Sequence, residues 1–89
     1  MRNILIVEDD IMLNHGICFN LQADGFNVIL AYLLKEGENI FNSNNIDLII
    51  LDINLPDGNG FEFCKKIREN SNVGILFLTA CDMESDIIN

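Results

Sequence analysis

The chain has 89 residues, of which 49% are hydrophobic, and its 14 acidic and 5 basic residues give a formal net charge of −9. A chain of this length forms one small domain that buries about 60% of its unfolded surface, so it leaves no room for a second domain. The acidic balance argues against direct contact with duplex nucleic acid, whose phosphates attract basic surfaces.

The sequence also argues against membrane insertion and secretion. No apolar stretch approaches the length of a membrane span, and the apolar run from Ile4 to Val7 is too short for a signal peptide. The three cysteines, an odd number at wide spacing, suit neither a disulfide framework nor a zinc site; they are Cys18, Cys64 and Cys81. We therefore expect a cytoplasmic protein with no membrane partner.

The first part of the chain predicts a strand followed by a helix. Residues 4–7 form an apolar run without alternation, which is typical of a strand buried on both faces. A helix is expected over residues 11–24, with Asp9 or Asp10 as its cap and Gly25 just after its end. Its apolar stripe consists of Leu13, Ile17 and Leu21.

The middle of the chain continues the alternation of strand and helix. Residues 26–31 predict a second strand, and residues 33–42 predict a weaker helix that Gly37 interrupts. Residues 46–51 are another apolar run without alternation and predict a third buried strand, which ends at Asp52.

The last part predicts a turn-rich loop over residues 55–60, a helix over residues 61–69, a fourth strand over residues 73–78 and the start of a helix from Glu84. The residues expected to face inward from the helix over 61–69 are Phe61, Cys64 and Ile67. Alternating strands and helices favour an α/β domain with helices on both faces of a parallel sheet.

Short polar side chains follow three of the four predicted strands. Glu8 and Asp9 follow the first strand, Asp52 follows the third and Thr79 follows the fourth. Ligands of open parallel sheets bind beyond the carboxyl ends of the strands, so we expect these four side chains to surround one crevice. Three clustered carboxylates repel one another, and a hard divalent cation relieves the repulsion. Oxygen ligands without His or Cys favour Mg²⁺.

Each acid also has an ordinary structural explanation when it is taken alone. Asp9 or Asp10 can cap the helix that follows, and Asp52 can be a solvated loop residue. Acids at two strand ends, together with Thr79 at a third, favour a common site over these separate explanations.

Three motifs, in this order, resemble the receiver domain of two-component response regulators. They are Ile-Leu-Ile-Val-Glu-Asp-Asp at residues 4–10, Asp-Leu-Ile-Ile-Leu-Asp-Ile-Asn-Leu-Pro-Asp-Gly-Asn-Gly-Phe-Glu-Phe at residues 47–63, and Leu-Phe-Leu-Thr-Ala at residues 76–80. The resemblance covers essentially the whole chain and is closest to the receivers of winged-helix transcription regulators. It implies a flavodoxin-like, doubly wound parallel sheet, whose strand order in the family is 2-1-3-4-5.

The resemblance implies that Asp52 is the phosphoacceptor, whose carboxylate attacks the phosphorus of a phosphohistidine on a sensor histidine kinase. It implies Mg²⁺ as cofactor, held by Asp9, by Asp52 and by the backbone carbonyl of Asn54, with Glu8 acting through a bound water. Such a domain catalyses its own phosphorylation and is not a turnover enzyme on a small molecule.

The resemblance further implies that Thr79 is a switch hydroxyl and that the backbone N–H of Ala80 contacts the phosphoryl group. A phosphoryl group adds about −1.5 to −2 charge and three acceptor oxygens, which is a sufficient local cause for a change of conformation. The implied result is control of an output domain outside these residues, a DNA-binding domain in transcription regulators, and homodimerisation through elements absent here.

The sequence departs from the family pattern at its carboxyl end. A receiver continues to a fifth strand, with a Lys that pairs with the phosphoryl group, and to a fifth helix. We therefore expect an incomplete receiver domain over residues 1–89, with sheet order 2-1-3-4 and the fifth strand missing. The strand over residues 73–78 would then lie at an open edge.

Two other functions stay open at the level of sequence. A pseudo-receiver uses the same fold as an interaction module without phosphorylation; the intact acids argue against it, while the absent Lys leaves it open. A phosphatase of the haloacid dehalogenase type also uses an aspartyl nucleophile after a strand. It needs a second Asp two residues later, where this chain has Asn54.

Overall fold

The computed structural model of the chain describes residues 2–78. The expectations for Thr79, Ala80, Cys81 and the helix from Glu84 therefore lie outside the described residues. Within residues 2–78, every helix is too short or too polar to cross a membrane.

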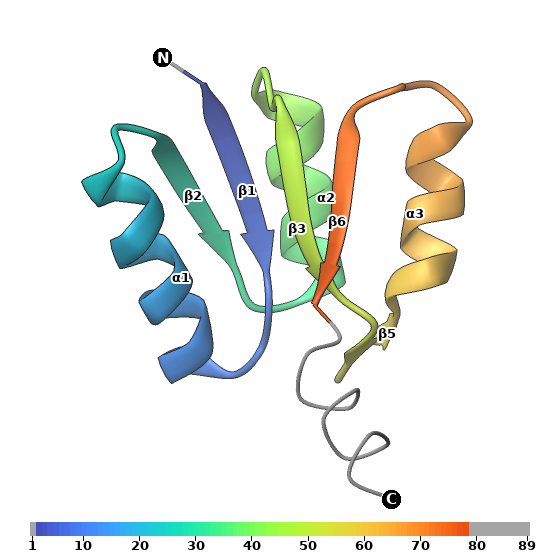
Figure 1. Cartoon of the computed structure of the whole chain (residues 1–89). Helices are drawn as coiled ribbons and strands as arrows, with labels where there is room; N and C mark the ends of the chain where they lie inside the picture. Colours follow the sequence, from blue (N-terminus) through green and yellow to red (C-terminus); the bar gives the residue numbers. More distant parts are fainter. Residues whose placement is uncertain (1, 79–89) are drawn as a thin grey trace, which may run out of the picture.

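A four-stranded parallel sheet forms the centre of the fold (Figure 1). Its strands are β1 (Asn3–Val7), β2 (Asn27–Ala31), β3 (Leu48–Asp52) and β6 (Gly74–Leu78). They lie in the order β2-β1-β3-β6, and all neighbouring pairs are parallel. The predicted order 2-1-3-4 is confirmed, because β6 is the fourth strand of this sheet along the chain.

Within residues 2–78, three helices cover the sheet, one on one face and two on the other (Figure 1). They are α1 (Ile11–Ala23), α2 (Leu34–Ser43) and α3 (Gly60–Arg68). The face under α1 buries Ile4, Ile6 and Ile50, and the face under α2 and α3 buries Leu5, Val7, Ile49 and Leu51. Neighbouring residues of a strand point to opposite faces, so the covered positions of β1 and β3, residues 4–7 and 48–51, are all apolar.

A short antiparallel hairpin lies where the sequence predicts only a turn-rich loop. Its strands are β4 (Asn54–Leu55) and β5 (Gly58–Asn59), with Asn54 opposite Asn59 and Leu55 opposite Gly58. Pro56 and Asp57 form the turn between them. The hairpin therefore occupies most of the connection between Asp52 and α3.

The inward faces of α1 and α3 differ from the prediction at one residue each, Leu13 and Phe61, whereas the other predicted residues, Ile17, Leu21, Cys64 and Ile67, pack in or against the core. In α1, Leu13 is 36% exposed, whereas the neighbouring Asn14 is fully buried. In α3, Phe61 is 49% exposed and Phe63 is buried instead. The sequence predicts that this helix begins at Phe61, whereas α3 begins at Gly60, and the side of α3 that packs on the core carries Phe63 rather than Phe61. The fully buried stripe is Gly60, Phe63 and Ile67, with Cys64 half-buried beside it.

Candidate functional site

Three acidic side chains meet at the carboxyl ends of β1 and β3. Glu8 and Asp9 follow β1 directly, and Asp52 is the last residue of β3. The two strands are hydrogen-bonded neighbours, so their ends lie side by side. One carboxylate oxygen from each of the three side chains lies within 4.8 Å of the others. The structure thus brings together three of the four side chains expected at this crevice, and the fourth, Thr79, lies outside the described residues.

Asp10, and not Asp9, caps the helix that follows β1. The Leu13 N–H donates a hydrogen bond to Asp10 Oδ1 at 3.1 Å. The Asp10 N–H in turn donates to Glu8 Oε2 at 2.8 Å, which holds the Glu8 carboxylate at the strand end. Glu8 is only 3% exposed, while Asp9 is exposed. The capping explanation therefore applies to Asp10 and leaves Asp9 to the acidic cluster.

Asn14 braces the strand ends beside this cluster, and the sequence analysis did not recognise it. Its Nδ2 donates to Glu8 O at 2.9 Å and to Ala31 O at 3.0 Å, so it joins α1 to the ends of β1 and β2. The side chain is fully buried, and its Oδ1 has no hydrogen-bond partner among the described residues. The available signal was its position four residues before Cys18, on the side of α1 that faces the sheet.

Burial and mutual repulsion disfavour the charged forms of these acids. Burial is the main cause that raises the pKa of Glu8 from 4.5 to about 7, and the charges of Asp52 and Asp9 add to it against the hydrogen bond from Asp10. Burial also raises the pKa of Asp52, although the hydrogen bond from the Ile53 N–H opposes the shift. The cluster therefore holds more negative charge than its surroundings compensate.

The donor set fits a hard divalent cation. All three side chains offer carboxylate oxygens, which are the ligands that Mg²⁺ prefers, and Mg²⁺ keeps several waters when few carboxylates bind it. A cation would also remove the repulsion that helps raise the pKa of Glu8. The residues present therefore fit Mg²⁺ by donor chemistry and by charge.

The start of α3 packs directly against the backbone of Asp52. The Gly60 N–H donates to Ile53 O at 2.6 Å. A Cβ at position 60 would collide with the backbone carbonyl oxygen of Asp52, so only glycine fits there. The sequence predicts only a turn-rich loop at Gly60 and does not indicate this close approach, which holds the segment after Asp52 in place.

The remaining predicted site residues surround Asp52 in sequence or in the sheet. Asn54 lies two residues after Asp52, at the start of β4, and is exposed. Its backbone carbonyl stays a predicted ligand. Leu78 lies opposite Asp52 in the sheet. Thr79 and Ala80 follow Leu78 in the sequence, outside the described residues, and their roles also stay predictions.

Comparisons with known proteins agree on one family. The family model described as response regulator receiver domain matches residues 4–89. Swarming motility regulation protein RssB of Serratia marcescens is 39% identical over 88 residues, which cover 98% of this chain and 40% of that protein. KDP operon transcriptional regulatory protein KdpE of Escherichia coli is 41% identical over 88 residues, which cover 99% of this chain and 39% of that protein. The chain thus spans about 40% of the length of these curated relatives.

Solved structures agree with the sheet order and its helices. The MaeR response regulator bound to beryllium trifluoride matches with a TM-score of 0.83 and 33% identity, over 88% of this chain and 66% of that one. Chemotaxis response regulator CheY4 of Vibrio cholerae matches with a TM-score of 0.83 and 32% identity, over 86% of this chain and 67% of that one. The flavodoxin-like fold expected from the sequence is confirmed.

Proposed function

The chain belongs to the response regulator receiver domain family, and on this basis we propose that it takes a phosphoryl group from a sensor histidine kinase onto Asp52 with the help of Mg²⁺. The observation that carries the proposal is the meeting of Glu8, Asp9 and Asp52 within 4.8 Å at two neighbouring strand ends. Response regulators act with sensor histidine kinases in two-component systems, which supports a phosphohistidine donor. Relatives named as transcriptional regulators support DNA-binding transcription control as the output.

In this proposal the carboxylates of Asp9 and Asp52 and the backbone carbonyl of Asn54 hold Mg²⁺, and Glu8 acts through a bound water. When bound, the cation offsets the repulsion between the acids and the incoming phosphoryl group and orients the transferring oxygens. Glu8 suits an indirect role because it is buried, whereas Asp9 is exposed and Asp52 is half-buried.

Asp52 supplies the nucleophile. One of its carboxylate oxygens forms a bond to phosphorus while the P–N bond of the phosphohistidine breaks and its electron pair returns to the imidazole nitrogen. The Ile53 N–H donates to Asp52 Oδ1 at 2.8 Å and so orients the carboxylate. Attack requires the ionised form of Asp52. Burial raises the pKa of Asp52 and so disfavours that form, whereas the positive charge of a bound Mg²⁺ would favour it.

The switch that follows phosphorylation is proposed from the resemblance. The Thr79 hydroxyl and the Ala80 backbone N–H are the groups that would respond to the new phosphoryl oxygens. The added charge of about −1.5 to −2 is large enough to change the conformation of the segment that meets it. Homodimerisation, where it occurs, would use elements outside these residues.

The exposed side of α1 offers a surface for the kinase. Met12 is 86% exposed, Phe19 is 73% exposed and Ile11 is 60% exposed. Apolar side chains gathered on one exposed helix mark a contact surface, and α1 starts beside the acidic cluster at its cap, Asp10. We therefore propose that the kinase contacts this side of α1. The proposed domain is cytoplasmic and makes no direct contact with nucleic acid or membrane.

The test is phosphorylation of the protein by acetyl phosphate in the presence of Mg²⁺, followed by mass spectrometry. We expect a gain of one phosphoryl group, which Asp52→Asn and removal of Mg²⁺ both abolish. Glu62→Gln is a matched control, because Glu62 is an exposed carboxylate on α3 outside the cluster, and it should gain the group as the wild type does. No gain in the wild type, or a gain that survives Asp52→Asn, contradicts the proposal.

The pseudo-receiver alternative is not favoured. Such a module needs the fold but not the acids, whereas this chain keeps three carboxylates together although burial, with a smaller contribution from the neighbouring acids, raises the pKa of Glu8 to about 7. A phosphatase of the haloacid dehalogenase type is disfavoured because position 54 holds Asn where that chemistry uses Asp.

A further inference from the structure

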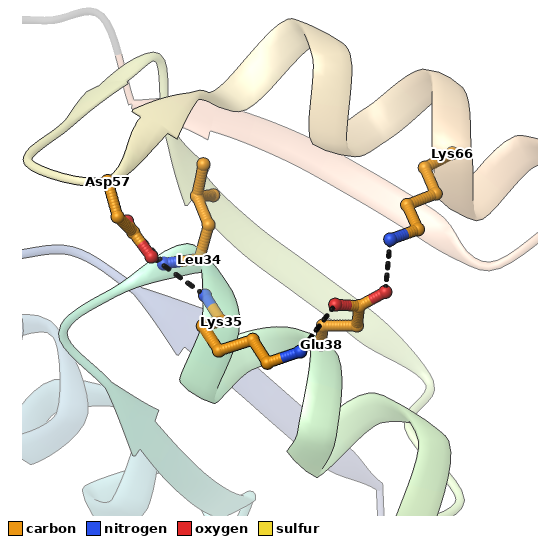
Figure 2. A network of polar contacts seen from close by, with 5 residues as sticks. All are labelled: Leu34, Lys35, Glu38, Asp57 and Lys66. Atoms are coloured by element: carbon orange, nitrogen blue, oxygen red, sulfur yellow. Dashed lines mark hydrogen bonds and ion pairs between the residues drawn. The ribbon is translucent and has the colours of Figure 1, made fainter.

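The α2 helix takes its cap from a distant part of the chain. Leu33 occupies the N-cap position of α2, and its side chain makes no capping hydrogen bond. Asp57, in the turn of the β4–β5 hairpin, accepts the Leu34 N–H on Oδ1 at 2.9 Å and the Lys35 N–H on Oδ2 at 3.0 Å. Figure 2 shows the Asp57 carboxylate directed at these two residues. A side chain 22 positions further along the chain thus satisfies N–H groups that a helix start leaves free.

The negative charge of Asp57 strengthens this contact. A carboxylate is favoured at a helix N-terminus, and its hydrogen bonds are charge-assisted. Desolvation raises the pKa of Asp57, but the hydrogen bonds from Leu34 and Lys35 outweigh it, so the pKa lies below its usual value. The other polar contacts of α2 in Figure 2 are exposed ion pairs of Glu38 with Lys66 and Lys35, which water screens. Asp57 is also exposed, and its contact differs from these ion pairs because it satisfies two backbone N–H groups at the start of the helix.

The hairpin turn also packs closely against α2. Gly58 has a φ of +153°, and a Cβ at this position would lie 2.9 Å from Leu34 Cδ1. The positive φ disfavours any other residue here, and the nearness of Leu34 adds to the preference for glycine. The hydrogen bonds that Asp57 accepts and the close approach at Gly58 together fix the distance between the turn and the helix.

The opposite end of the same segment is tied to Asp52. The Ile53 N–H donates to Asp52 Oδ1, and Ile53 O accepts the Gly60 N–H. Asn54, whose backbone carbonyl is a proposed Mg²⁺ ligand, lies between this tie and the turn. Residues 53–59 are thus held by the acidic cluster at one end and by α2 at the other.

We propose that Asp57 is a positioning residue: by capping α2 it fixes residues 53–59, and with them the Asn54 carbonyl, relative to Asp52. This inference rests on the proposed function and names a side chain outside the acidic cluster that supports it. Without the cap the turn is free to move, whereas Glu8, Asp9 and Asp52 keep their places at the strand ends. Loss of Asp57 therefore weakens Mg²⁺ binding without removing the phosphoacceptor.

Amide hydrogen exchange of the metal-free protein tests the link directly. In Asp57→Ala, exchange should accelerate about fivefold at Leu34 and Lys35, which is the factor that corresponds to the loss of one helix cap. Exchange at Ile53 and Gly60 should also accelerate. The matched control is Asn44→Ala, which removes the hydrogen bond from Asn44 Nδ2 to Ile40 O at the other end of α2. This control should leave exchange at Ile53 and Gly60 unchanged.

Calorimetric titration with Mg²⁺ gives the second measurement. Asp57→Ala should bind Mg²⁺ about tenfold more weakly, as expected when a group that orients a metal ligand is removed. The phosphorylation rate at saturating Mg²⁺ should stay near that of the wild type. Asp57→Asn keeps the size and one acceptor oxygen but loses the charge and one of the two accepted hydrogen bonds, so its affinity should fall between those of the wild type and Asp57→Ala, and it carries the test if the Ala variant does not fold.

The proposal requires both effects. Faster exchange confined to Leu34 and Lys35, or Mg²⁺ affinity equal to that of the wild type, overturns it, because Asp57 then stabilises only α2. A wild-type protein that neither binds Mg²⁺ nor gains a phosphoryl group gives a different result: the proposed function is then wrong, and the role of Asp57 falls with it.

Discussion

The two ends of the sheet carry opposite kinds of polar structure. At the amino end, the Asn3 N–H donates to Asp47 Oδ2 at 2.7 Å, and Asn3 Nδ2 donates to Asn45 O at 2.7 Å. Asn3 Oδ1 also accepts a hydrogen bond from Asn27 Nδ2 at 2.9 Å. One side chain thus joins the start of β1 to the start of β2 and to the residues before β3, with donors matched to acceptors.

At the carboxyl end of the same strands, the polar groups are poorly matched. Three carboxylates lie together, burial and repulsion raise the pKa of Glu8 to about 7, and Asn14 Oδ1 is buried without a partner. Such groups lower the free energy of unfolding. The comparison teaches that the strands are secured at one end, while the other end keeps an uncompensated negative charge that suits a divalent cation.

The largest loss of stability is expected at Asn14, whose Nδ2 makes two buried hydrogen bonds although its Oδ1 has no partner among residues 2–78. Asn14→Ala removes the donor that serves Glu8 O and Ala31 O in a fully buried place. The free energy of unfolding should fall by about 2–3 kcal/mol, since buried acceptors lose a partner and a cavity forms. Urea unfolding followed by circular dichroism measures this, because the chain has no Trp for fluorescence.

Asn20→Ala is the matched control for Asn14, since Asn20 is an exposed Asn of the same helix. Its effect should stay within about 0.5 kcal/mol. Equal losses in the two variants would show that Asn14 does not brace the strand ends.

An intermediate effect of opposite sign is expected at Glu8. Glu8→Gln should raise the free energy of unfolding of the metal-free protein at pH 8 by about 1–2 kcal/mol, allowing for solvent screening at the open strand end. The folded pKa of about 7 lies above the usual 4.5, so the folded state binds the Glu8 proton more tightly than the unfolded state does. The penalty is therefore absent below pH 4.5, grows between pH 4.5 and 7, and is complete above pH 7.

Urea unfolding at pH 4 and pH 8 without metal separates this effect from a simple gain of packing. The advantage of Glu8→Gln should vanish at pH 4, and added Mg²⁺ should stabilise the wild type more than the variant. Glu62→Gln, at an exposed carboxylate, should show no such advantage at either pH. An advantage of Glu8→Gln that is the same at both pH values would contradict the electrostatic explanation.

The sequence predicts those features that depend on neighbouring residues in the chain. Apolar runs without alternation identify β1 and β3, and acids placed at the strand ends predict the cluster of Glu8, Asp9 and Asp52. Parallel strands bring their carboxyl ends to one edge, so local position is enough to infer this part of the site.

Features set by tertiary packing are not predictable in this way. Asn14 finds its partners 6 and 17 residues away, and the rotation of α1 decides whether Asn14 or Leu13 faces the sheet. In α3, Phe63 rather than Phe61 lies in the core, and the packing of the helix against the sheet decides which of the two is buried. The cap that Asp57 supplies to α2 crosses 22 residues and has no counterpart in the local sequence around Leu33.

The smallest effect is expected at the amino end, where the network is exposed. Asn3→Ala removes the side-chain bonds to Asn45 O and from Asn27 Nδ2 but keeps the backbone bond to Asp47. The free energy of unfolding should fall by about 1 kcal/mol, because water replaces exposed partners, whereas it cannot reach those of Asn14. Asn39→Ala, at an exposed position of α2, is the control and should change it less. A loss at Asn3 as large as that at Asn14 would mean that both ends depend equally on buried polar contacts, and the contrast between a securing end and a functional end would be wrong.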